Sequence, residues 1–120
     1  MPRRPPALSL RPRIRIVRAD GVIVFGPGKA DLLEEIRAHG SIRQAAQNLG
    51  MSYMRAWKLI RVMNEAFPRP LVEKTRGGAE HGGAVLTPDG ETVLALYRTM
   101  EKKATAAMTA EWRKLKGMLS

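Results

Sequence analysis

The sequence predicts a mainly α-helical fold with small β elements (α+β) in one domain. The chain has 120 residues, which is enough for one hydrophobic core but not for two. Its hydrophobic content of 44% is that of a folded protein rather than of a disordered one. Apolar residues recur at the spacing of amphipathic helices through most of the chain, and short β-rich runs lie within residues 13–25 and 71–86.

The chain is strongly basic, and its charge is unevenly distributed. Lys and Arg total 21 against 11 acidic residues, and no acidic residue occurs between Arg37 and Asn64. This balance favours binding to nucleic acid or to an anionic surface.

No stretch approaches the roughly 18 apolar residues of a membrane-spanning helix, and no apolar run follows the basic start as in a signal peptide. We therefore expect a cytoplasmic protein that does not associate with membranes.

The first part of the chain predicts an arm and a β-hairpin. Residues 1–12 hold four of the eight prolines and are expected to form a flexible Pro/Arg-rich arm. Two β-rich runs, 13–18 and 22–25, flank the turn signal Asp20-Gly21 and predict the hairpin. A helix is then expected from Gly26-Pro27-Gly28 to about residue 39, where a glycine favours its end.

Two short amphipathic helices that meet at Gly50 are the most informative part of the sequence. Ser41 is a typical first cap, and Gln44 three residues later completes a capping-box pattern. Ser52 is expected to cap the second helix. Ala46 lies four residues before Gly50, where a small side chain lets two helices cross closely. This spacing is typical of a helix-turn-helix.

A strand, a glycine-rich loop and a returning strand follow the helix pair, which is the pattern of a wing. Thr87 and Pro88 then predict the start of a final helix. The predicted fold is a winged helix-turn-helix with an N-terminal β-hairpin and a long C-terminal helix. The predicted organisation is an arm at 1–12, a DNA-binding domain at 13–87 with its helix-turn-helix at 41–65 and its wing at 71–86, and a dimerisation helix at 88–120.

The final helix is expected to run unbroken to about Lys116. It would then be roughly 43 Å long, whereas a globule of this size has a radius of gyration of only about 14 Å. A partner helix is the simplest cover for its far half, so we expect a homodimer; a frayed or folded-back tail is the alternative. The predicted dimerisation residues recur at spacings of three and four: Val93, Tyr97, Met100, Ala104, Met108, Trp112 and Leu115.

Several short segments between Phe25 and Tyr97 match a known family in order. They are Gly40-Ser41-Ile42, Met51-Ser52-Tyr53, Ala56-Trp57, Met63-Asn64, Leu71-Val72-Glu73, Arg76-Gly77-Gly78, Gly82-Gly83-Ala84, and Leu86-Thr87 with Gly90. The region resembles the N-terminal DNA-binding domain of the ModE family, the molybdate-responsive transcriptional regulators related to the LysR type. The resemblance implies a dimeric winged helix in which the long C-terminal helix pairs the subunits.

The sequence also departs from the family pattern in two places. The family's molybdate-binding portion follows the long helix, and because this chain ends at Ser120 we expect no molybdate-binding domain in it. Within the wing, Ala79-Glu80-His81 interrupts a loop that in the family is richer in glycine and carries lysine. Glu80 would oppose a phosphate.

The predicted function is sequence-specific binding of double-stranded DNA by a prokaryotic transcriptional regulator, at a pseudo-palindromic site. The start of the second helix is expected to lie nearest the bases, with Arg55 as the guanine-binding residue because its planar fork matches two acceptors. Ordinary solvation of the basic face, and packing of Tyr53 under the turn, are the alternatives. The predicted DNA-binding residues are Ser52, Tyr53, Met54 and Arg55 near the bases; Lys58 and Arg61 at phosphates; Ser41, Arg43 and Gln44 at the backbone; and Arg76, Gly77, Gly78 and His81 in the wing.

Other classes of function receive less support from the sequence. Gly26-Pro27-Gly28-Lys29 lacks the full phosphate-loop pattern, and no nucleophile, base and acid are evident as a set, so we expect no enzyme and no cofactor. The chain has no cysteine, and His39 and His81 stand alone, so no metal site is expected. A protein-interaction module, a nonspecific architectural nucleic-acid-binding protein and an RNA-binding protein remain alternatives.

Overall fold

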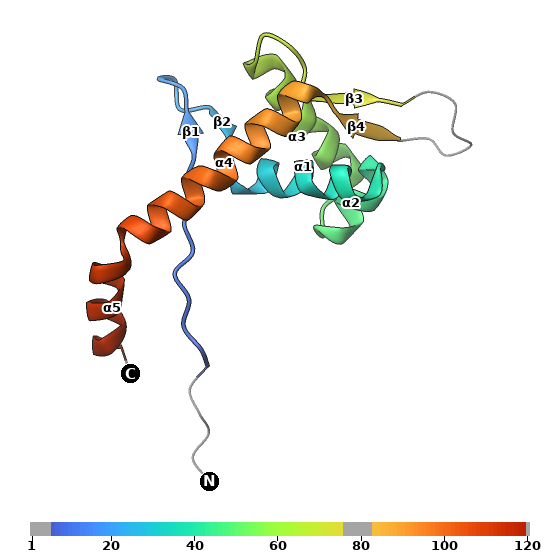
Figure 1. Ribbon diagram of the computed structural model, residues 1–120. Helices are drawn as coiled ribbons and strands as arrows, with labels where there is room; N and C mark the ends of the chain where they lie inside the picture. Colours follow the sequence, from blue (N-terminus) through green and yellow to red (C-terminus); the bar gives the residue numbers. More distant parts are fainter. Residues whose placement is uncertain (1–5, 76–82, 120) are drawn as a thin grey trace.

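The computed structural model describes residues 6–75 and 83–119 and confirms the mainly helical fold with small β elements (Figure 1). The two strand pairs lie on either side of the helix-turn-helix, and the chain ends in two helices that extend away from it. The elements in chain order are β1 (Ile16–Val17), β2 (Ile23–Phe25), α1 (Pro27–His39), α2 (Ile42–Asn48), α3 (Tyr53–Ala66), β3 (Val72–Lys74), β4 (Ala84–Leu86), α4 (Pro88–Ala107) and α5 (Thr109–Met118).

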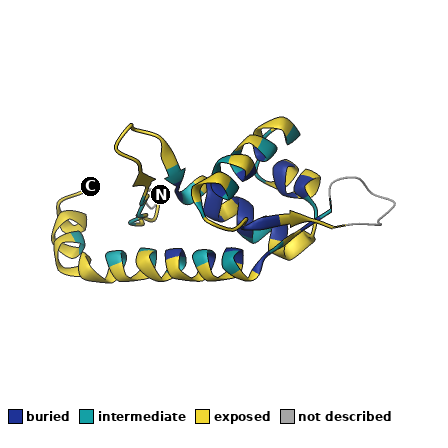
Figure 2. Cartoon of the chain, turned by 90° about the horizontal axis from the view of Figure 1, so that it is seen from above, coloured by how far each residue is buried: buried dark blue, intermediate teal, exposed yellow. Residues whose placement is uncertain are grey.

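The hydrophobic core lies where α1, α2 and α3 pack together and against the first half of α4 (Figure 2). Phe25 at the end of β2 meets Tyr97 of α4 edge-on, with ring centroids 5.1 Å apart. This contact joins the N-terminal hairpin to the C-terminal helix. The other largest fully buried side chains are Leu32, Leu33 and Ile36 of α1, Ile42 of α2, Ile60 and Met63 of α3, Leu71 before β3, and Leu94 of α4.

The predicted helix caps are confirmed in the helix-turn-helix. The Ser41 hydroxyl accepts a hydrogen bond from the Gln44 N–H at 3.0 Å, and the Ser52 hydroxyl accepts one from the Arg55 N–H at 3.1 Å. Each bond satisfies an N–H that has no partner within its helix. The capping box at Ser41 is only half formed, because the Gln44 side chain donates to Asn48 at 2.8 Å.

Two glycines set the angles between successive helices. Gly40 ends α1 at φ 65°, and Gly50 lies between α2 and α3 at φ 67°. Both are in the left-handed region that glycine adopts without steric cost. Ala46 is buried at the crossing of α2 with α3, and its carbonyl accepts a hydrogen bond from the Met51 N–H at 3.0 Å. The helix-turn-helix prediction is thus confirmed, apart from the half-formed capping box.

Both predicted hairpins form, with shorter strands than expected. The turn of the first contains Gly21 at φ 89°, and its strands pair antiparallel with a register shift between Ile16 and Val17. Both residues are exposed, which explains why β1 covers only part of the predicted run. The second hairpin pairs β3 with β4 in regular register, with Lys74 opposite Ala84. This pair is the base of the wing.

The prediction of one continuous C-terminal helix is wrong, because the helix breaks at Met108. Figure 1 shows α5 turned away from the axis of α4. The hydroxyls of Thr105 and Thr109 donate to the carbonyls of Glu101 and Ala106, a kind of bond that bends helices. The radius of gyration of 17.7 Å still exceeds the roughly 14 Å of a compact chain of this length. The C-terminal part therefore projects from the domain, but not as one rod.

Two of the predicted dimerisation residues instead face their own domain. Tyr97 is 2% exposed, and its hydroxyl donates to the Ile14 carbonyl at 2.7 Å. Val93 is half-buried against the same core. The side of α4 that faces the core runs from Gly90 through Leu94 to Tyr97, a spacing of four and three residues. The sequence analysis therefore assigned Val93 and Tyr97 to the dimer interface, although they lie on the side of α4 that packs against its own domain.

The start of α4 is held tightly against the base of the wing. The Thr87 N–H donates to the Leu71 carbonyl at 2.9 Å, and the Thr87 hydroxyl donates to the Pro70 carbonyl at 2.8 Å. The same hydroxyl caps α4 by accepting from the Gly90 N–H at 3.0 Å. A Cβ atom at Gly90 would overlap the Leu71 carbonyl oxygen, so only glycine allows the helix to lie this close.

Candidate nucleic-acid interface

The outer face of α3 carries a row of unpaired basic side chains. Arg55, Lys58 and Arg61 are spaced three residues apart and are all exposed. Across the described residues, 6–75 and 83–119, none of the three forms an ion pair. A helical row of cations without carboxylates is free to bind a polyanion. We refer to these three residues as the basic row.

The opposite face of α3 fixes the helix in the domain. Ala56, Ile60 and Met63 are buried in the core, and Leu59 is half-buried. These positions recur at the spacing of one helical face. The burial of this face leaves the basic row directed outward.

Asn64 joins the end of α3 to the wing, a role that the sequence analysis did not assign to it. Its side-chain carbonyl accepts hydrogen bonds from the N–H groups of Leu71 at 2.8 Å and Val72 at 3.2 Å. Its amide nitrogen donates to the Val72 carbonyl at 3.2 Å. The bonding distances show that β3 is tied directly to α3. The sequence does not distinguish this asparagine from a solvent-facing one. Its partners lie seven and eight residues later, beyond the turn at Pro68 and Pro70, so no short-range pattern marks the contact.

The residues predicted to lie nearest the bases differ in their solvent exposure and in whether their side chains already have partners within the protein. Met54 is 78% exposed, and Arg55 beside it is exposed as well. The Ser52 hydroxyl is already engaged as the cap of α3. Tyr53 is half-buried and meets Trp57 edge-on, with ring centroids 6.3 Å apart. Tyr53 thus packs against Trp57 of the same helix, and its contact with DNA stays a prediction.

The residues predicted to clamp the DNA backbone lie at the start of α2. Arg43 is exposed, and its guanidinium carbon lies 4.8 Å from the centre of the Tyr53 ring. The Ser41 hydroxyl and the Gln44 side chain already have partners within α2. Arg43 is the charged residue of this group, and its guanidinium forms no ion pair in the described residues.

The wing residues Arg76, Gly77, Gly78 and His81 lie outside the described residues. The described base of the wing ends at Thr75 on one side and begins again at Gly83 on the other, joined by a hydrogen bond of 3.0 Å from the Thr75 N–H to the Gly83 carbonyl. Lys74, which the sequence analysis did not single out, lies with its ammonium nitrogen 4.6 Å from the centre of the Trp57 ring. The base of the wing therefore contacts α3 in two ways, through the Asn64 hydrogen bonds and through the contact of Lys74 with the Trp57 ring.

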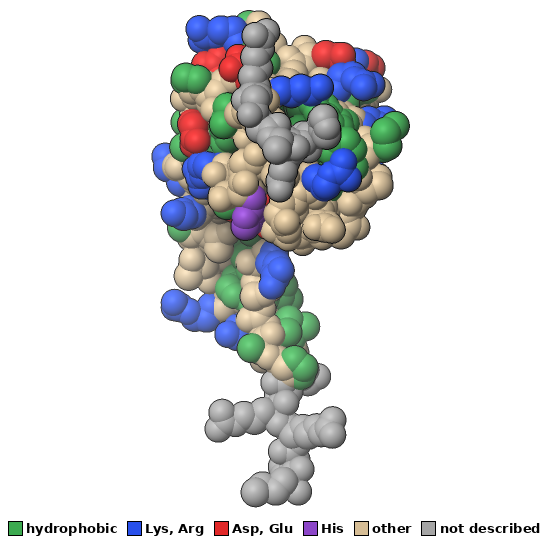
Figure 3. Space-filling model, turned by 90° about the vertical axis from the view of Figure 1, so that its right-hand side faces the viewer, with side chains coloured by type: hydrophobic (Ala, Val, Ile, Leu, Met, Phe, Trp, Pro, Cys, Tyr) green, Lys and Arg blue, Asp and Glu red, His purple; other side chains and the backbone are tan. Residues whose placement is uncertain are grey.

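Several basic residues away from α3 are paired with acids. Arg37 pairs with Glu91 at 3.2 Å, and Arg69 pairs with Asp89 at 2.8 Å. Figure 3 views the side that carries the wing, where acidic side chains gather in the upper half of the view and basic ones extend over both halves. Acidic residues thus neutralise some of the cations around α1 and α4, whereas none of the ion pairs among the described residues involves a basic side chain of α3.

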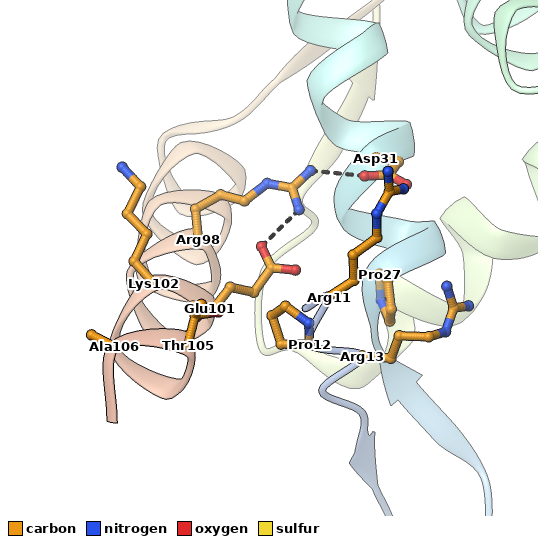
Figure 4. A pocket seen from close by; sticks show the side chains of 10 residues that line it. All are labelled: Arg11, Pro12, Arg13, Pro27, Asp31, Arg98, Glu101, Lys102, Thr105 and Ala106. Carbon is orange, nitrogen blue, oxygen red and sulfur yellow. Dashed lines mark hydrogen bonds and ion pairs between the residues drawn. The ribbon is translucent and has the colours of Figure 1, made fainter. Parts of the chain in front are cut away.

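Arg98 is the most heavily paired cation of the described residues. Its guanidinium contacts Glu34 at 2.6 Å, Glu101 at 2.8 Å and Asp31 at 2.9 Å (Figure 4). Burial acts to lower the pKa of Arg98, but its hydrogen bonds to the three carboxylates outweigh burial and raise the pKa above its ordinary value. Arg98 therefore joins α1 to α4 as a permanent cation.

A hollow of about 610 Å³ lies next to this cluster, between the arm and α4. Figure 4 shows Arg11 of the arm and the nearby Arg13 on one side and Lys102 of α4 on the other. Mixed charges line it, and none of the predicted DNA-binding residues belongs to it. The hollow is therefore separate from the candidate interface.

No group of three or more His, Cys, Asp and Glu side chains in the described residues could hold a metal ion. His39 lies 3.1 Å from Glu35, one helical turn earlier in α1. No helix in the described part of the chain is both long and apolar enough to cross a membrane.

Comparison with known families places the fold and the basic row in context. Residues 29–91 match the family described as bacterial regulatory helix-turn-helix protein, lysR family. The chain belongs to this family. The matched range begins in α1, includes α2, α3 and the wing, and ends in the first turn of α4. The lysR family is one of regulators, and the expectation that the protein is no enzyme is confirmed by this membership.

Curated relatives agree with the ModE resemblance. The chain is 40% identical over 86 residues to the transcriptional regulator ModE of Haemophilus influenzae, a match that covers 72% of this chain and 34% of the relative. It is 44% identical over 71 residues to the DNA-binding transcriptional dual regulator ModE of Escherichia coli K12, covering 59% and 27%. It is 42% identical over 77 residues to the molybdenum transport protein ModE of Azotobacter vinelandii, covering 64% and 28%. The chain thus spans about a third or less of the length of these relatives.

The fold also resembles that of a solved structure. The crystal structure of the CbnR_DBD–DNA complex superimposes with a TM-score of 0.58, covering 73% of this chain and 95% of that one. The two sequences are 17% identical. The likeness confirms the winged helix-turn-helix fold.

Proposed function

We propose that the chain is the DNA-binding part of a bacterial transcriptional regulator that binds a pseudo-palindromic duplex site as a homodimer, in the cytoplasm. The observation that carries the proposal is the basic row of α3, which is exposed, directed outward by a buried opposite face and free of ion pairs within the described residues. Membership of a helix-turn-helix regulator family supports it.

In the proposed complex α3 enters the major groove with its N-terminal end leading. Its 14 residues correspond to about 21 Å of helix, enough to follow the groove for half a turn of DNA. Met54 and Arg55 are the most open side chains at this end. Arg55 is assigned to guanine, since its guanidinium can donate two parallel hydrogen bonds to N7 and O6. Lys58 and Arg61 follow along the helix and are assigned to phosphates.

Residues outside α3 are proposed to fix the register on the backbone. Arg43 lies beside the start of α3 and retains its charge. The wing residues Arg76, Gly77, Gly78 and His81 are proposed to reach the neighbouring minor groove or its phosphates. Because phosphate contacts carry no sequence information, these residues determine affinity rather than preference.

The proposed homodimer is supported by apolar side chains that the domain leaves uncovered. The second half of α4 and α5 expose several large apolar groups, and α5 has no buried residue. An uncovered apolar face of this kind marks a protein contact. The revised interface omits Val93 and Tyr97, retains Met100, Ala104, Met108, Trp112 and Leu115, and adds Leu96, which is 61% exposed.

The experiment that tests the proposal is selection of bound sequences from a random duplex library at about 150 mM salt, which suppresses purely electrostatic binding. An enriched inverted repeat supports a sequence-specific dimer. Binding without enrichment would instead indicate an architectural protein, and no binding at low salt would favour a protein-interaction module. Sedimentation at tens of micromolar protein, about the concentration of a weak dimer, tests the homodimer by itself: a monomer there would contradict it.

The names of the relatives extend the proposal to the regulated genes. Three relatives carry the name ModE, and one of these is named as a molybdenum transport protein. We propose a link to molybdenum for this chain on that basis. The selected repeat is then expected in front of genes for molybdenum uptake or use, and its absence there would contradict the link without affecting DNA binding.

A further inference from the structure

Lys74, the last residue of β3, is held by an aromatic ring rather than by an acid. Its ammonium nitrogen lies 4.6 Å from the centre of the Trp57 ring. In the described ranges no carboxylate forms an ion pair with it. The face of an indole attracts a cation through its quadrupole, but the ring has no net charge. The contact therefore restrains the ammonium and leaves its charge unneutralised.

Trp57 is itself restrained on α3. Its ring is half-buried and stands perpendicular to that of Tyr53, one turn earlier, at an interplanar angle of 90°. Tyr53 in turn lies under the Arg43 guanidinium. The aromatic pair Tyr53–Trp57 thus contacts one cation from α2 and one from β3.

The position of Lys74 places its charge beside the basic row. A hollow of about 390 Å³ between α3 and β3 is lined by both Lys74 and Arg61. The other residues that line it are Trp57, Ile60, Asn64 and Glu65, and Glu65 forms no ion pair with either cation in the described residues. The Asn64 hydrogen bonds to Leu71 and Val72 fix the start of β3 against the same helix. Strand β3 is therefore attached to α3 at two points, by Asn64 at its start and by the contact of Lys74 with Trp57 at its end, and Lys74 lies beside Arg61 of the basic row.

We propose that Lys74 binds a DNA phosphate at the base of the wing and that Trp57 is the positioning residue that holds its ammonium there. The inference rests on the proposed function, because it adds a contact to the same interface. A lysine restrained in this way loses less conformational freedom on binding than a free surface lysine does. The restraint also keeps the base of the wing at a constant distance from α3.

The first test measures the binding of the full chain to a labelled duplex over a series of salt concentrations. Lys74→Met removes the charge and keeps the length of the side chain. It is expected to weaken binding to selected and random duplexes alike, by about three- to tenfold, and to reduce the salt slope by about 0.9 per subunit. Lys74→Arg keeps both charge and ring contact and should restore the slope. Lys102→Met, at an exposed lysine of α4, is the matched control and should leave it unchanged.

The second test examines whether Trp57 acts through Lys74. Trp57→Leu removes the aromatic face but keeps an apolar side chain, and Trp57→Phe keeps a smaller ring. Trp57→Leu should reduce the salt slope when Lys74 is present and have no further effect on it in the Lys74→Met background. A residue that only supported the fold would weaken binding equally in both backgrounds. Circular dichroism identifies any variant that fails to fold; Trp57→Met, which also lacks an aromatic face, then takes the place of Trp57→Leu, and Trp57→Phe should keep most of the salt slope.

The contact itself can be observed without DNA. Protons above an aromatic ring are shielded by its ring current, so the NMR signals of the Lys74 Cε protons should lie upfield of those of other lysines. Trp57→Leu should return them to the ordinary position. Ordinary shifts in the wild-type protein would overturn the positioning role.

Failure of the inference and failure of the proposed function give different results. If the wild-type protein binds duplex DNA and Lys74→Met has the same affinity and salt slope, Lys74 binds no phosphate, while the proposed function stands. If the wild-type protein binds no duplex even at low salt, both are overturned. A reduced slope for Lys74→Met that Lys74→Arg restores supports both.

Discussion

Arg55 on α3 and Arg98 on α4 are arginines of one domain with opposite surroundings. Arg98 is 26% exposed in its side chain and contacts three carboxylates, whereas Arg55 is exposed and pairs with none in the described residues. The two helices do not differ in a need for positive charge, since both are parts of the same basic chain. They differ in where the 11 acidic residues were placed. A cation that is paired with carboxylates holds two segments of the fold together, whereas an unpaired cation is available to bind a ligand.

The first prediction removes the paired arginine. Arg98→Ala leaves three carboxylates without their common partner and should lower the free energy of unfolding by about 2–3 kcal/mol. Urea unfolding at one fixed protein concentration measures this loss. Arg69→Ala is the control, because its pair with Asp89 is exposed and should contribute less than about 1 kcal/mol. Equal losses for the two variants would show that the Arg98 cluster adds no more than a surface pair.

The second prediction removes the unpaired arginine. Arg55→Ala should cost about 1–3 kcal/mol of discrimination at one base pair in each half-site. Its free energy of unfolding should stay within about 0.5 kcal/mol of the wild type, since no described contact of the side chain is lost. Competition binding with single-base variants of the selected duplex measures the discrimination. Equal losses on selected and random DNA would contradict base reading by Arg55.

The third prediction concerns a phosphate contact of the basic row. Lys58→Ala should weaken binding to all duplexes similarly, by about 1 kcal/mol or less, and reduce the salt slope by about 0.9 per subunit. Affinity measured from low to physiological salt tests this. Lys102→Ala should leave the slope as it is. A loss confined to the selected sequence would assign Lys58 to a base instead.

The fourth prediction uses Lys29, a buried cation that forms no ion pair with an acid of the described residues. It is 8% exposed, donates to the Ile23 carbonyl at 2.9 Å, and has its pKa lowered by burial. The unfolded chain then holds this proton up to its ordinary pKa near 10.5, while the folded chain releases it earlier. Wild-type stability should therefore rise relative to that of Lys29→Met as pH approaches 10.5. Parallel pH profiles of unfolding for the two proteins would contradict this.

Local features of the fold could be predicted from the sequence, because their causes lie within a few residues. Ser41, Ser52 and Thr87 cap helices through N–H groups three residues away, and Gly40 and Gly50 adopt the left-handed conformation at the turns. Such interactions leave a pattern in the sequence. The order of elements and the buried face of α3 followed from the same kind of signal.

The features that were missed depend on contacts between distant segments. Tyr97 belongs to the core because Phe25 and Ile14 meet it there, far away in the chain. Lys74 acquires its position from Trp57, which lies on another element. Periodicity does not specify which side of an apolar helix its own domain covers. The break at Met108 was missed for a different reason, since neither glycine nor proline marks it.

The close packing at Gly90 joins the wing to the helix of the proposed dimer, and this affects the spacing of the two half-sites on the DNA. Because α4 lies directly against the Leu71 carbonyl, and the Thr87 bonds hold it there, little bending is available between the wing base and the helix that leads to the partner. The distance and rotation between the two copies of α3 are then set by how two α4 helices cross. Half-sites in such an arrangement must keep one helical phase on the DNA. Insertion of about half a helical turn, roughly five base pairs, between them would place one half-site on the opposite side of the duplex, out of reach of the second subunit.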